Sequence, residues 1–384
     1  MTTTKISWTD HTVNFWWGCT KVSPACQHCY AAAMGPRFGP KLFGQPVLWG
    51  AGKPRFERLQ SARKEALKLN ANAERCRLIR GIPMIRSGSV QSVGQPVHGV
   101  FVGDVRVPLK KRETQVIPVA EWDNAPLYRP RVFVNSMSDW LDDEVPIAWL
   151  AYLLETLHLC PHLDFQLLTK RPENWQERLR LTLGPEGCGD VGITENWLLG
   201  TPPPNVWIGT TAENQEWADK RIPHLLKIPA TVRFLSCEPL LGPLDIIYAL
   251  YRSKASRVCP HCLFATNRLS ETHCPNDGKP LGADPAIDWI ITGGESGGSA
   301  RPSHPAWFRS LRDQCAAAGV PFFFKQWGEW ISVDNLKHGA EGSLAKSYKG
   351  HKHPDGTLML RLGTARAGHL LEGTEHHAFP STQP

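Results

Sequence analysis

The sequence predicts an α/β protein whose parallel strands form a full or partial β/α (TIM-like) barrel. Short runs of β-branched and aromatic residues recur along the 384-residue chain, and helical patterns of apolar residues separate them. This alternation favours parallel pairing through right-handed crossovers. Polar residues follow most runs directly, as expected where the carboxyl ends of parallel strands meet at one rim. A doubly wound open sheet is the alternative.

The expected elements follow one another in a regular order. The strands are expected at residues 13–16, 131–135, 165–168, 206–208, 232–235, 289–292 and 321–324. Apolar residues recur every three or four positions over 147–157 and 307–315, which is typical of helices. We therefore assign residues 1–332 to the barrel and residues 333–384, which hold few apolar residues, to a C-terminal tail that is mostly surface coil.

Composition limits the class of protein. The chain is 41% hydrophobic and 21% charged, as in globular proteins. No window approaches 18 consecutive apolar residues, and residues 1–30 lack the order of a signal peptide. We expect no membrane partner and a cytoplasmic location, the host cytoplasm if a phage encodes the protein. Eleven cysteines cannot all pair with one another, and in a reducing compartment thiolate ligation of a metal is favoured over disulfides.

Positive charge is concentrated in one insertion, residues 41–130. The whole chain has a formal charge of +7, whereas this segment has 16 Lys plus Arg against 7 Asp plus Glu. A helix is expected over residues 53–81, with basic residues outside its apolar face. Such an excess is typical of a surface that binds a phosphate-bearing partner, which suggests nucleic acid, DNA in particular. A solvated helix face is the alternative interpretation.

The first cysteine group is Cys19, Cys26 and Cys29, which directly follows the first expected strand. Three thiolates on one loop can hold three irons of a 4Fe-4S cluster and leave the fourth iron without a protein ligand. The alternative is a zinc site of three cysteines with His28 as the fourth ligand.

The second cysteine group lies in another insertion, residues 255–284. Cys259, Cys262 and Cys274, completed by Asp277 or His273, match the ligand types of a structural zinc ribbon. A second iron-sulfur cluster and unligated thiols are the alternatives.

The sequence resembles the phage-associated three-cysteine-motif proteins related to the radical S-adenosylmethionine superfamily. The resemblance rests on SWTD at 7–10, GCTKVSP at 18–24, CQHCYA at 26–31, VNSMSD at 134–139, LLTKRP at 167–172, WIGTT at 207–211, SCEPLL at 236–241, GGESG at 293–297 and FFKQWG at 323–328. It implies a radical S-adenosylmethionine barrel with a 4Fe-4S cluster, S-adenosylmethionine as cofactor and an electron donor such as flavodoxin or ferredoxin. The first cysteine gap is longer than the usual three residues of the superfamily.

The resemblance also suggests roles for polar residues at the rim. The Gly-Gly-Glu motif that binds the methionine amino group in the superfamily follows the second strand, whereas here it follows a late strand, so we do not assign that role to Glu295. The residues expected to bind the cofactor are Tyr30, Ser136, Ser138, Asp139, Thr169, Thr211 and Glu213. Those expected to act on the substrate are Lys170, Glu238 and Lys325. Helix capping by the rim residues and ion pairs among the last three are the structural alternatives.

The expected function is a radical S-adenosylmethionine enzyme that modifies a nucleic-acid base. One such reaction is an isomerisation that rearranges an amino-acid substituent on thymine during hypermodification of phage DNA. Two alternatives remain: a metal-stabilised nucleic-acid-binding module without catalysis, and a radical enzyme that acts on a small metabolite.

Overall fold

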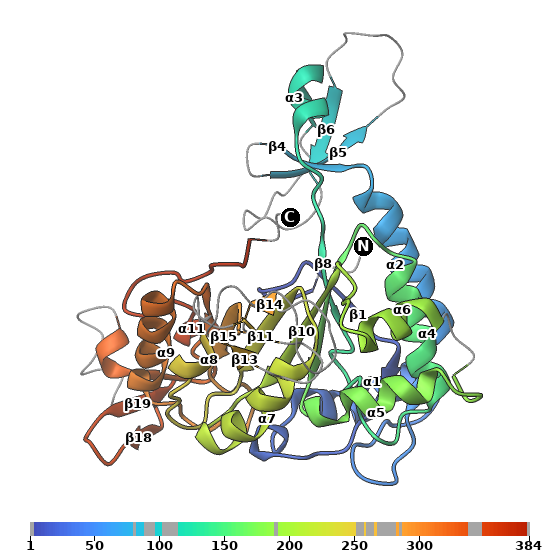
Figure 1. Ribbon diagram of the computed structural model, residues 1–384. Helices are drawn as coiled ribbons and strands as arrows, with labels where there is room; N and C mark the ends of the chain where they lie inside the picture. Colours follow the sequence, from blue (N-terminus) through green and yellow to red (C-terminus); the bar gives the residue numbers. More distant parts are fainter. Residues whose placement is uncertain are drawn as a thin grey trace.

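A parallel sheet forms the centre of the protein (Figure 1). The computed structural model describes residues 4–79, 82–87, 97–101, 114–187, 191–250, 257–258, 265–266, 282–283, 286–336 and 348–381. Among them, seven strands are hydrogen-bonded in the order β1 (His11–Val13), β8 (Arg131–Val134), β9 (Asp164–Thr169), β10 (Val206–Thr211), β11 (Val232–Cys237), β15 (Trp289–Gly293) and β16 (Phe322–Gln326), every pair parallel.

Strand order decides between the two expected architectures. Strands of the sheet succeed one another in chain order without reversal, whereas a doubly wound sheet reverses direction at a switch point. Right-handed crossovers in one direction place the connecting helices on one face of the sheet. The partial α/β barrel is thus confirmed, with β1 and β16 as its two edges among the described residues.

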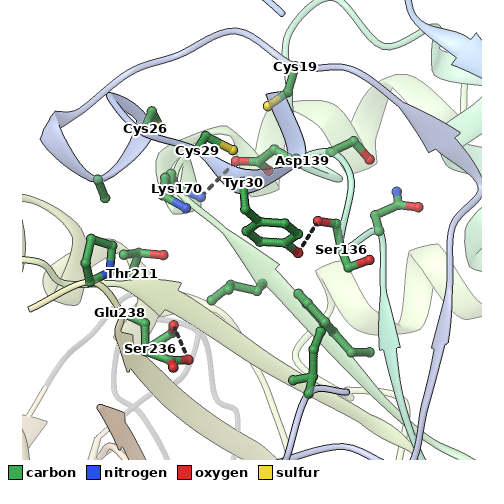
Figure 2. Close-up of a pocket in the computed structure, with 18 of the residues that line it drawn as sticks. Cys19, Cys26, Cys29, Tyr30, Ser136, Asp139, Lys170, Thr211, Ser236 and Glu238 are labelled. Atoms are coloured by element: carbon green, nitrogen blue, oxygen red, sulfur yellow. Dashed lines mark hydrogen bonds between the residues drawn. The ribbon is translucent and has the colours of Figure 1, made fainter. Parts of the chain in front are cut away.

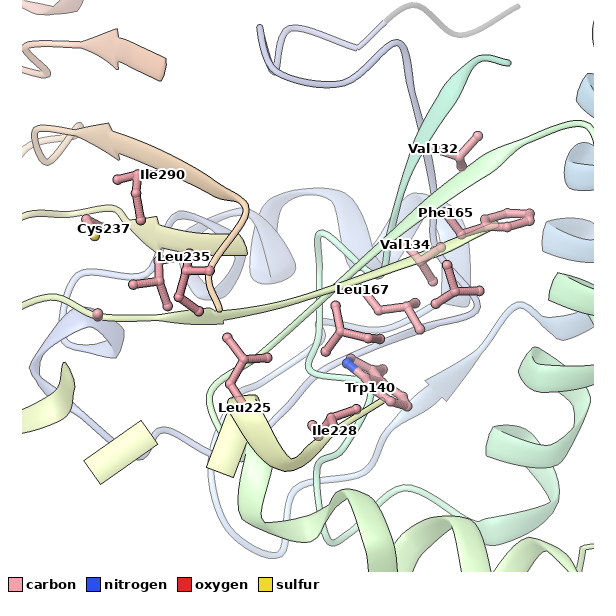
Figure 3. Packing of buried hydrophobic residues seen from close by; sticks show 14 of the residues in the cluster. Val132, Val134, Trp140, Phe165, Leu167, Leu225, Ile228, Leu235, Cys237 and Ile290 are labelled. Atoms are coloured by element: carbon pink, nitrogen blue, oxygen red, sulfur yellow. The ribbon is translucent and has the colours of Figure 1, made fainter. Parts of the chain in front are cut away.

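Helices cover the convex face. They are α4 (Ile147–His158), α5 (Trp175–Thr182), α6 (Val191–Leu198), α7 (Gln215–Lys227), α8 (Ile247–Leu250) and α9 (Pro305–Ala318), with a 3-10 turn η2 (Pro172–Asn174) before α5. Their apolar sides pack on alternate residues of the strands, for example on Val132, Val134 and Phe165 (Figure 3). None of the helices in the described part of the chain is long and apolar enough to cross a membrane.

The remaining strand residues face the concave side. A second core there is mainly aromatic and includes Trp8, Phe133, Trp207, Phe234, Trp289 and Phe323. Gly209 makes room for it, because a Cβ at this position would lie 2.4 Å from the Phe234 ring. Aromatic side chains therefore fill the part of the concave face away from the carboxyl ends of the strands, and polar residues occupy the carboxyl end.

The basic insertion begins with β3 (Phe56–Glu57) and α2 (Leu59–Ala73) and continues as an antiparallel sheet of β4 (Cys76–Ile79), β5 (Ile82–Ser87), β6 (Val97–Phe101) and β7 (Thr114–Ile117), followed by α3 (Val119–Asn124). The expectation of a helix over residues 53–81 is wrong at both ends. β3 pairs with β2 (Trp16–Trp17) and β4 pairs with β5, so strand pairing takes the residues on either side of α2.

The tail is more ordered than a surface coil. It contains the 3-10 turn η3 (Val333–Asn335), β18 (Gly350–Lys352), β19 (Leu358–Arg361) and α11 (Thr364–Ala367), and β19 pairs with β17 (Trp330–Ser332) at the end of the barrel segment. Residues 376–378 then follow the edge strand β16: the Phe324 amide donates to the His376 carbonyl at 2.7 Å, and the Ala378 amide donates to the Phe322 carbonyl at 3.2 Å. Most described residues of the tail lie outside helices and strands, as expected, but the tail is not confined to the surface, because Met359, Leu360 and Leu371 are buried and residues 376–378 cover a sheet edge whose backbone groups would otherwise be free.

Three two-residue strands, β12 (Arg257–Val258), β13 (Ala265–Thr266) and β14 (Gly282–Ala283), pair within the second insertion. Cys259, Cys262, Cys274, Asp277 and the alternative ligand His273 lie outside the described residues, so the zinc ribbon stays a prediction.

Candidate active site at the carboxyl end of the sheet

A cavity of about 400 Å³ lies at the carboxyl end of the sheet. One side is the cysteine loop, residues 18–30, which joins β2 to α1 (Tyr30–Phe43) and contains the 3-10 turn η1 (Pro24–Cys26). All three cysteines of the first group line the cavity. Figure 2 shows them facing Thr211, Ser236 and Glu238 across it. The prediction that the loop and the strand ends share one rim is therefore confirmed by their common cavity.

Local backbone contacts fix Cys26 and Cys29 relative to each other. The Cys26 amide donates to the Ser23 carbonyl at 2.9 Å, and the Cys29 amide donates to the Cys26 carbonyl at 3.4 Å. Cys29 is also the N-cap residue of α1. Cys26 thus ends the 3-10 turn η1 and Cys29 caps α1 three residues later, while Cys19 comes from the opposite end of the loop.

Side chains from late strands hold the middle of the loop. The Ala25 amide donates to Glu213 Oε1 at 3.2 Å, and Glu213 Oε2 pairs with Arg221 at 2.9 Å in a fully buried contact. Arg301 donates to the Pro24 carbonyl at 3.0 Å and pairs with Glu295 at 2.6 Å. Glu213, predicted to bind the cofactor, therefore holds the backbone next to Cys26, and it does not line the cavity.

The start of the loop is held in the same way. Arg171 donates to the Thr20 carbonyl at 2.6 Å, and Asp142 accepts the Thr20 amide at 3.2 Å. Arg55 pairs with Asp142 at 2.7 Å and donates to the Thr20 hydroxyl at 2.8 Å. The backbone around the cysteines is thus fixed by side chains of the barrel and of the basic insertion, while the thiols line the cavity.

Asp139 lies at the cavity with both oxygens occupied. Its Oδ1 accepts the Thr169 hydroxyl at 2.7 Å and the Leu141 amide at 3.0 Å, and its Oδ2 accepts the Lys170 amide at 2.8 Å and Arg171 at 3.0 Å. The Thr169 hydroxyl also accepts the Arg171 amide at 2.9 Å. In this state, Asp139 and Thr169 shape the turn after β9.

The loop after β8 carries the other residues predicted to bind the cofactor. Ser138 donates to the Trp16 carbonyl at 3.0 Å, and Ser136 contacts the Asn14 side-chain oxygen at 3.2 Å. The Tyr30 hydroxyl donates to the Ser136 carbonyl at 2.6 Å. Ser136, Ser138 and Tyr30 all line the cavity, so the structure brings together what the sequence motifs only list in order.

The expected residues for substrate chemistry divide into a pair and a single lysine. Glu238 accepts Lys325 at 3.0 Å and the Trp8 indole at 3.1 Å, which bears out an ion pair between these two rim residues. Lys170 has no side-chain partner among the described residues. Thr211 is completely buried, and its hydroxyl also lacks a partner there.

The surroundings of Cys19 disfavour its thiolate form. Burial raises the pKa of the Cys19 thiol well above its ordinary range, and Asp139, Cys29, Asp142 and Cys26 raise this pKa further. A nucleophilic cysteine needs the opposite shift, so the site gives Cys19 no activation as a nucleophile.

A single-ion zinc site is not assembled. His28 Nδ1 lies 3.4 Å from Glu295. Across the described residues, which include His28 and the first cysteine group, no three His, Cys, Asp or Glu side chains converge as ligands of one metal ion. The alternative of three cysteines and His28 around one zinc therefore gains no support from the geometry.

Several important residues were not singled out from the sequence. Trp8, Asn135, Arg171 and Arg301 contact the loop, line the cavity or do both, and the role of Glu295 as partner of Arg301 was not expected. Arg171 and Asn135 stand inside strand-end motifs and were detectable by position. Trp8 and Arg301 act through contacts distant in sequence, which no local pattern reveals.

Fold and cavity define the protein as a partial α/β barrel with a cysteine-bearing loop over the carboxyl end of its sheet. A family model described as protein of unknown function (DUF5131) matches residues 3–380, and the chain belongs to that family. No curated protein and no solved structure matches the chain.

Proposed function

We propose that the protein is a radical S-adenosylmethionine enzyme, with Cys19, Cys26 and Cys29 as ligands of a 4Fe-4S cluster. The observation that carries the proposal is that all three thiols line one cavity at the carboxyl end of a partial β/α barrel. This end of parallel barrels is where active sites are built.

The residues fit a cluster better than a single ion. Three cysteines bind three different irons of a 4Fe-4S cluster, so their sulfurs need not converge on one point. The two ends of the loop supply them separately, and no convergence on one ion exists among the described residues. With S-adenosylmethionine, such a cluster supplies an electron and a 5′-deoxyadenosyl radical that abstracts hydrogen from a substrate.

The protein's own residues would bind, orient and shield the ligands. One wall of the cavity is apolar and would exclude water there; it is formed by Trp8, Phe133 and Leu168. A volume of about 400 Å³ is within the range of small-molecule sites. The hydrogen bonds and ion pairs that hold the loop backbone would keep the cysteines in place while ligands enter and leave.

We propose a nucleic-acid base as the substrate, supported by the exposed cations of the basic insertion. They include Lys41, Lys53, Lys64, Lys68 and Arg75. Part of the positive charge is structural, because Arg55, Arg63 and Arg129 pair with Asp142, Glu155 and Asp164. The K64Q/K68Q variant should weaken binding to a DNA duplex and reduce its salt dependence, as measured by fluorescence anisotropy, whereas R63Q should act mainly on stability. Unchanged DNA binding by K64Q/K68Q would remove α2 from the interface.

Anaerobic reconstitution tests the cluster. The wild-type protein should take up about four irons and four sulfides and form 5′-deoxyadenosine from S-adenosylmethionine and dithionite. C19A, C26A and C29A should each lose both properties. C160A is the matched control, because Cys160 is a buried thiol far from the loop in sequence, with a pKa raised to about 12 by burial. If the wild-type protein instead bound one zinc ion at Cys19, Cys26 and Cys29 and took up no iron, the proposal would be refuted. DNA binding that survives in C19A/C26A/C29A, without any 5′-deoxyadenosine from the wild type, would identify a binding module instead.

A further inference from the structure

The cavity wall contains polar atoms without partners, and all of them can donate hydrogen bonds. Thr211 and Asn135 are both buried, and the Thr211 hydroxyl and Asn135 Nδ2 have no partner in the described residues. Asn135 Oδ1 accepts the Phe15 amide at 2.7 Å, which identifies the free atom as the donor nitrogen. Trp49 Nε1 is a third lining donor without a partner in the described residues, and the Lys170 ammonium is a fourth, as no contact of its side chain occurs in the same residues.

The carboxylate acceptors of the wall are already in use. Each carboxylate that lines the cavity has a cationic partner: Asp139 has Arg171 at 3.0 Å, Glu238 has Lys325 at 3.0 Å, and Glu295 has Arg301 at 2.6 Å. Apart from the exposed Lys5, Lys170 is the lysine or arginine of the lining that no carboxylate of the described residues neutralises. The wall is therefore rich in donors and carries an excess positive charge.

Two of the free donors are neighbours on the sheet. Thr169 and Thr210 are register partners on β9 and β10, so Lys170 and Thr211 follow them side by side. Adjacent strands are about 4.8 Å apart. Residues alternate between faces, and Leu168 and Gly209 face the concave side, so Lys170 and Thr211 do as well. Figure 2 shows both on the wall below the cysteine loop.

We propose that Lys170 and Thr211 bind an oxyanion of the substrate, a carboxylate or a phosphate. An ammonium and a hydroxyl side by side match the acceptor oxygens of such a group, and a charged acceptor satisfies a buried donor best. The substrate oxygen would also be the acceptor that the protein itself does not provide. The choice of nucleosides below rests on the proposed function, but the oxyanion site does not depend on the cluster.

Titration calorimetry with the full-length protein, without reconstitution, tests the site. The ligands are 2′-deoxyuridine, its 5′-monophosphate and 5-carboxy-2′-deoxyuridine, which separate a phosphate from a base carboxylate. One of the two anionic compounds should bind about 10- to 100-fold more tightly than 2′-deoxyuridine, the range expected for hydrogen bonds to a charged group. K170Q should abolish this preference and T211V should reduce it. K5Q is the control, because Lys5 also lines the cavity but is exposed.

Equal affinity of the wild type for all three compounds, or no binding of either anion, would overturn the proposal, and this comparison does not depend on the folding of any variant. Equal loss in K170Q and K5Q would overturn it too. If K170Q instead weakens S-adenosylmethionine and leaves the preference among nucleosides intact, the oxyanion belongs to the cofactor and the assignment to substrate is wrong. A failure of cluster formation would leave these binding results unchanged, so the two proposals fail separately.

Discussion

Replacing Glu213 by alanine should destabilise the protein and loosen the cysteine loop together. The Glu213 carboxylate is 0% exposed and pairs with Arg221 at 2.9 Å. Burial lowers the pKa of Arg221, and the charge of Glu213 opposes that shift. Removal of one partner of a buried pair costs about 3–5 kcal/mol. Arg221 would keep its bonds to the Thr211 and Lys170 carbonyls, which favours the lower end, about 3 kcal/mol.

Thermal unfolding followed by circular dichroism measures this cost. At about 2 °C per kcal/mol for a long chain, E213A should lower Tm by about 6 °C. E213Q/R221M removes both charges and keeps an acceptor for the Ala25 amide, so it should lose less than the sum of its single variants. E216A is the control, because Glu216 forms an exposed pair with Lys220 and should change stability by less than about 0.5 kcal/mol. Additive losses in E213Q/R221M, or an E213A loss equal to that of E216A, would refute the reasoning.

Three further variants test the barrel. G209A should cost about 1–3 kcal/mol in urea unfolding because its Cβ would overlap a Phe ring, whereas G298A, with open space around the Cβ, should be near neutral; equal losses would contradict the packing. Burial alone would raise the pKa of Asp10, but the charge and hydrogen bonds of Arg131 outweigh it and hold this pKa below 3.8. The stabilisation is therefore present above about pH 4 and lost as pH falls through the folded pKa. D10N should be less stable than the wild type at pH 6, and its Tm should fall less steeply towards pH 3. Parallel curves of Tm against pH for D10N and the wild type would argue against this. F379A should cost about 2 kcal/mol, because the half-buried ring packs between two aromatic residues of the sheet; an unchanged Tm would show that the tail does not support the barrel.

The fold was predictable from the sequence where burial of an element produces a local pattern of apolar residues. Strands such as those at 165–168 and 232–235 are almost entirely buried on both faces, so apolar residues predominate in them, interrupted only by Gln166 and Arg233, between helical patterns. The sheet β4–β7 and the strand pairing after residue 330 were missed. Their short strands owe their conformation to partners elsewhere in the chain, as Phe324 does in pairing with the end of the tail.

The location of the site was predictable, but the roles of its residues were not. Polar residues after parallel strands indicate a rim, and the cavity forms there. Whether such a residue faces a ligand or the protein depends on what packs over it. Thr211 ends β10 and Glu213 follows two residues later, yet Glu213 is paired with Arg221 behind the loop while Thr211 faces the cavity without a partner among the described residues.

Carboxylate–arginine pairs around the cysteine loop explain why some rim residues face the protein and others face the cavity. Four pairs hold the loop, namely Asp139–Arg171, Asp142–Arg55, Glu213–Arg221 and Glu295–Arg301. In two of these pairs the arginine, Arg171 or Arg301, also donates to a loop carbonyl. In the other two the carboxylate, Glu213 or Asp142, accepts a loop amide, so both kinds of backbone group find partners. Each pair is neutral in total, so the loop is fixed without net charge being added beside the thiols. Among the charged side chains of the lining, Lys170 and the exposed Lys5 are then the ones that no carboxylate of the described residues neutralises, so the net charge of the cavity depends on Lys170 and on what it binds.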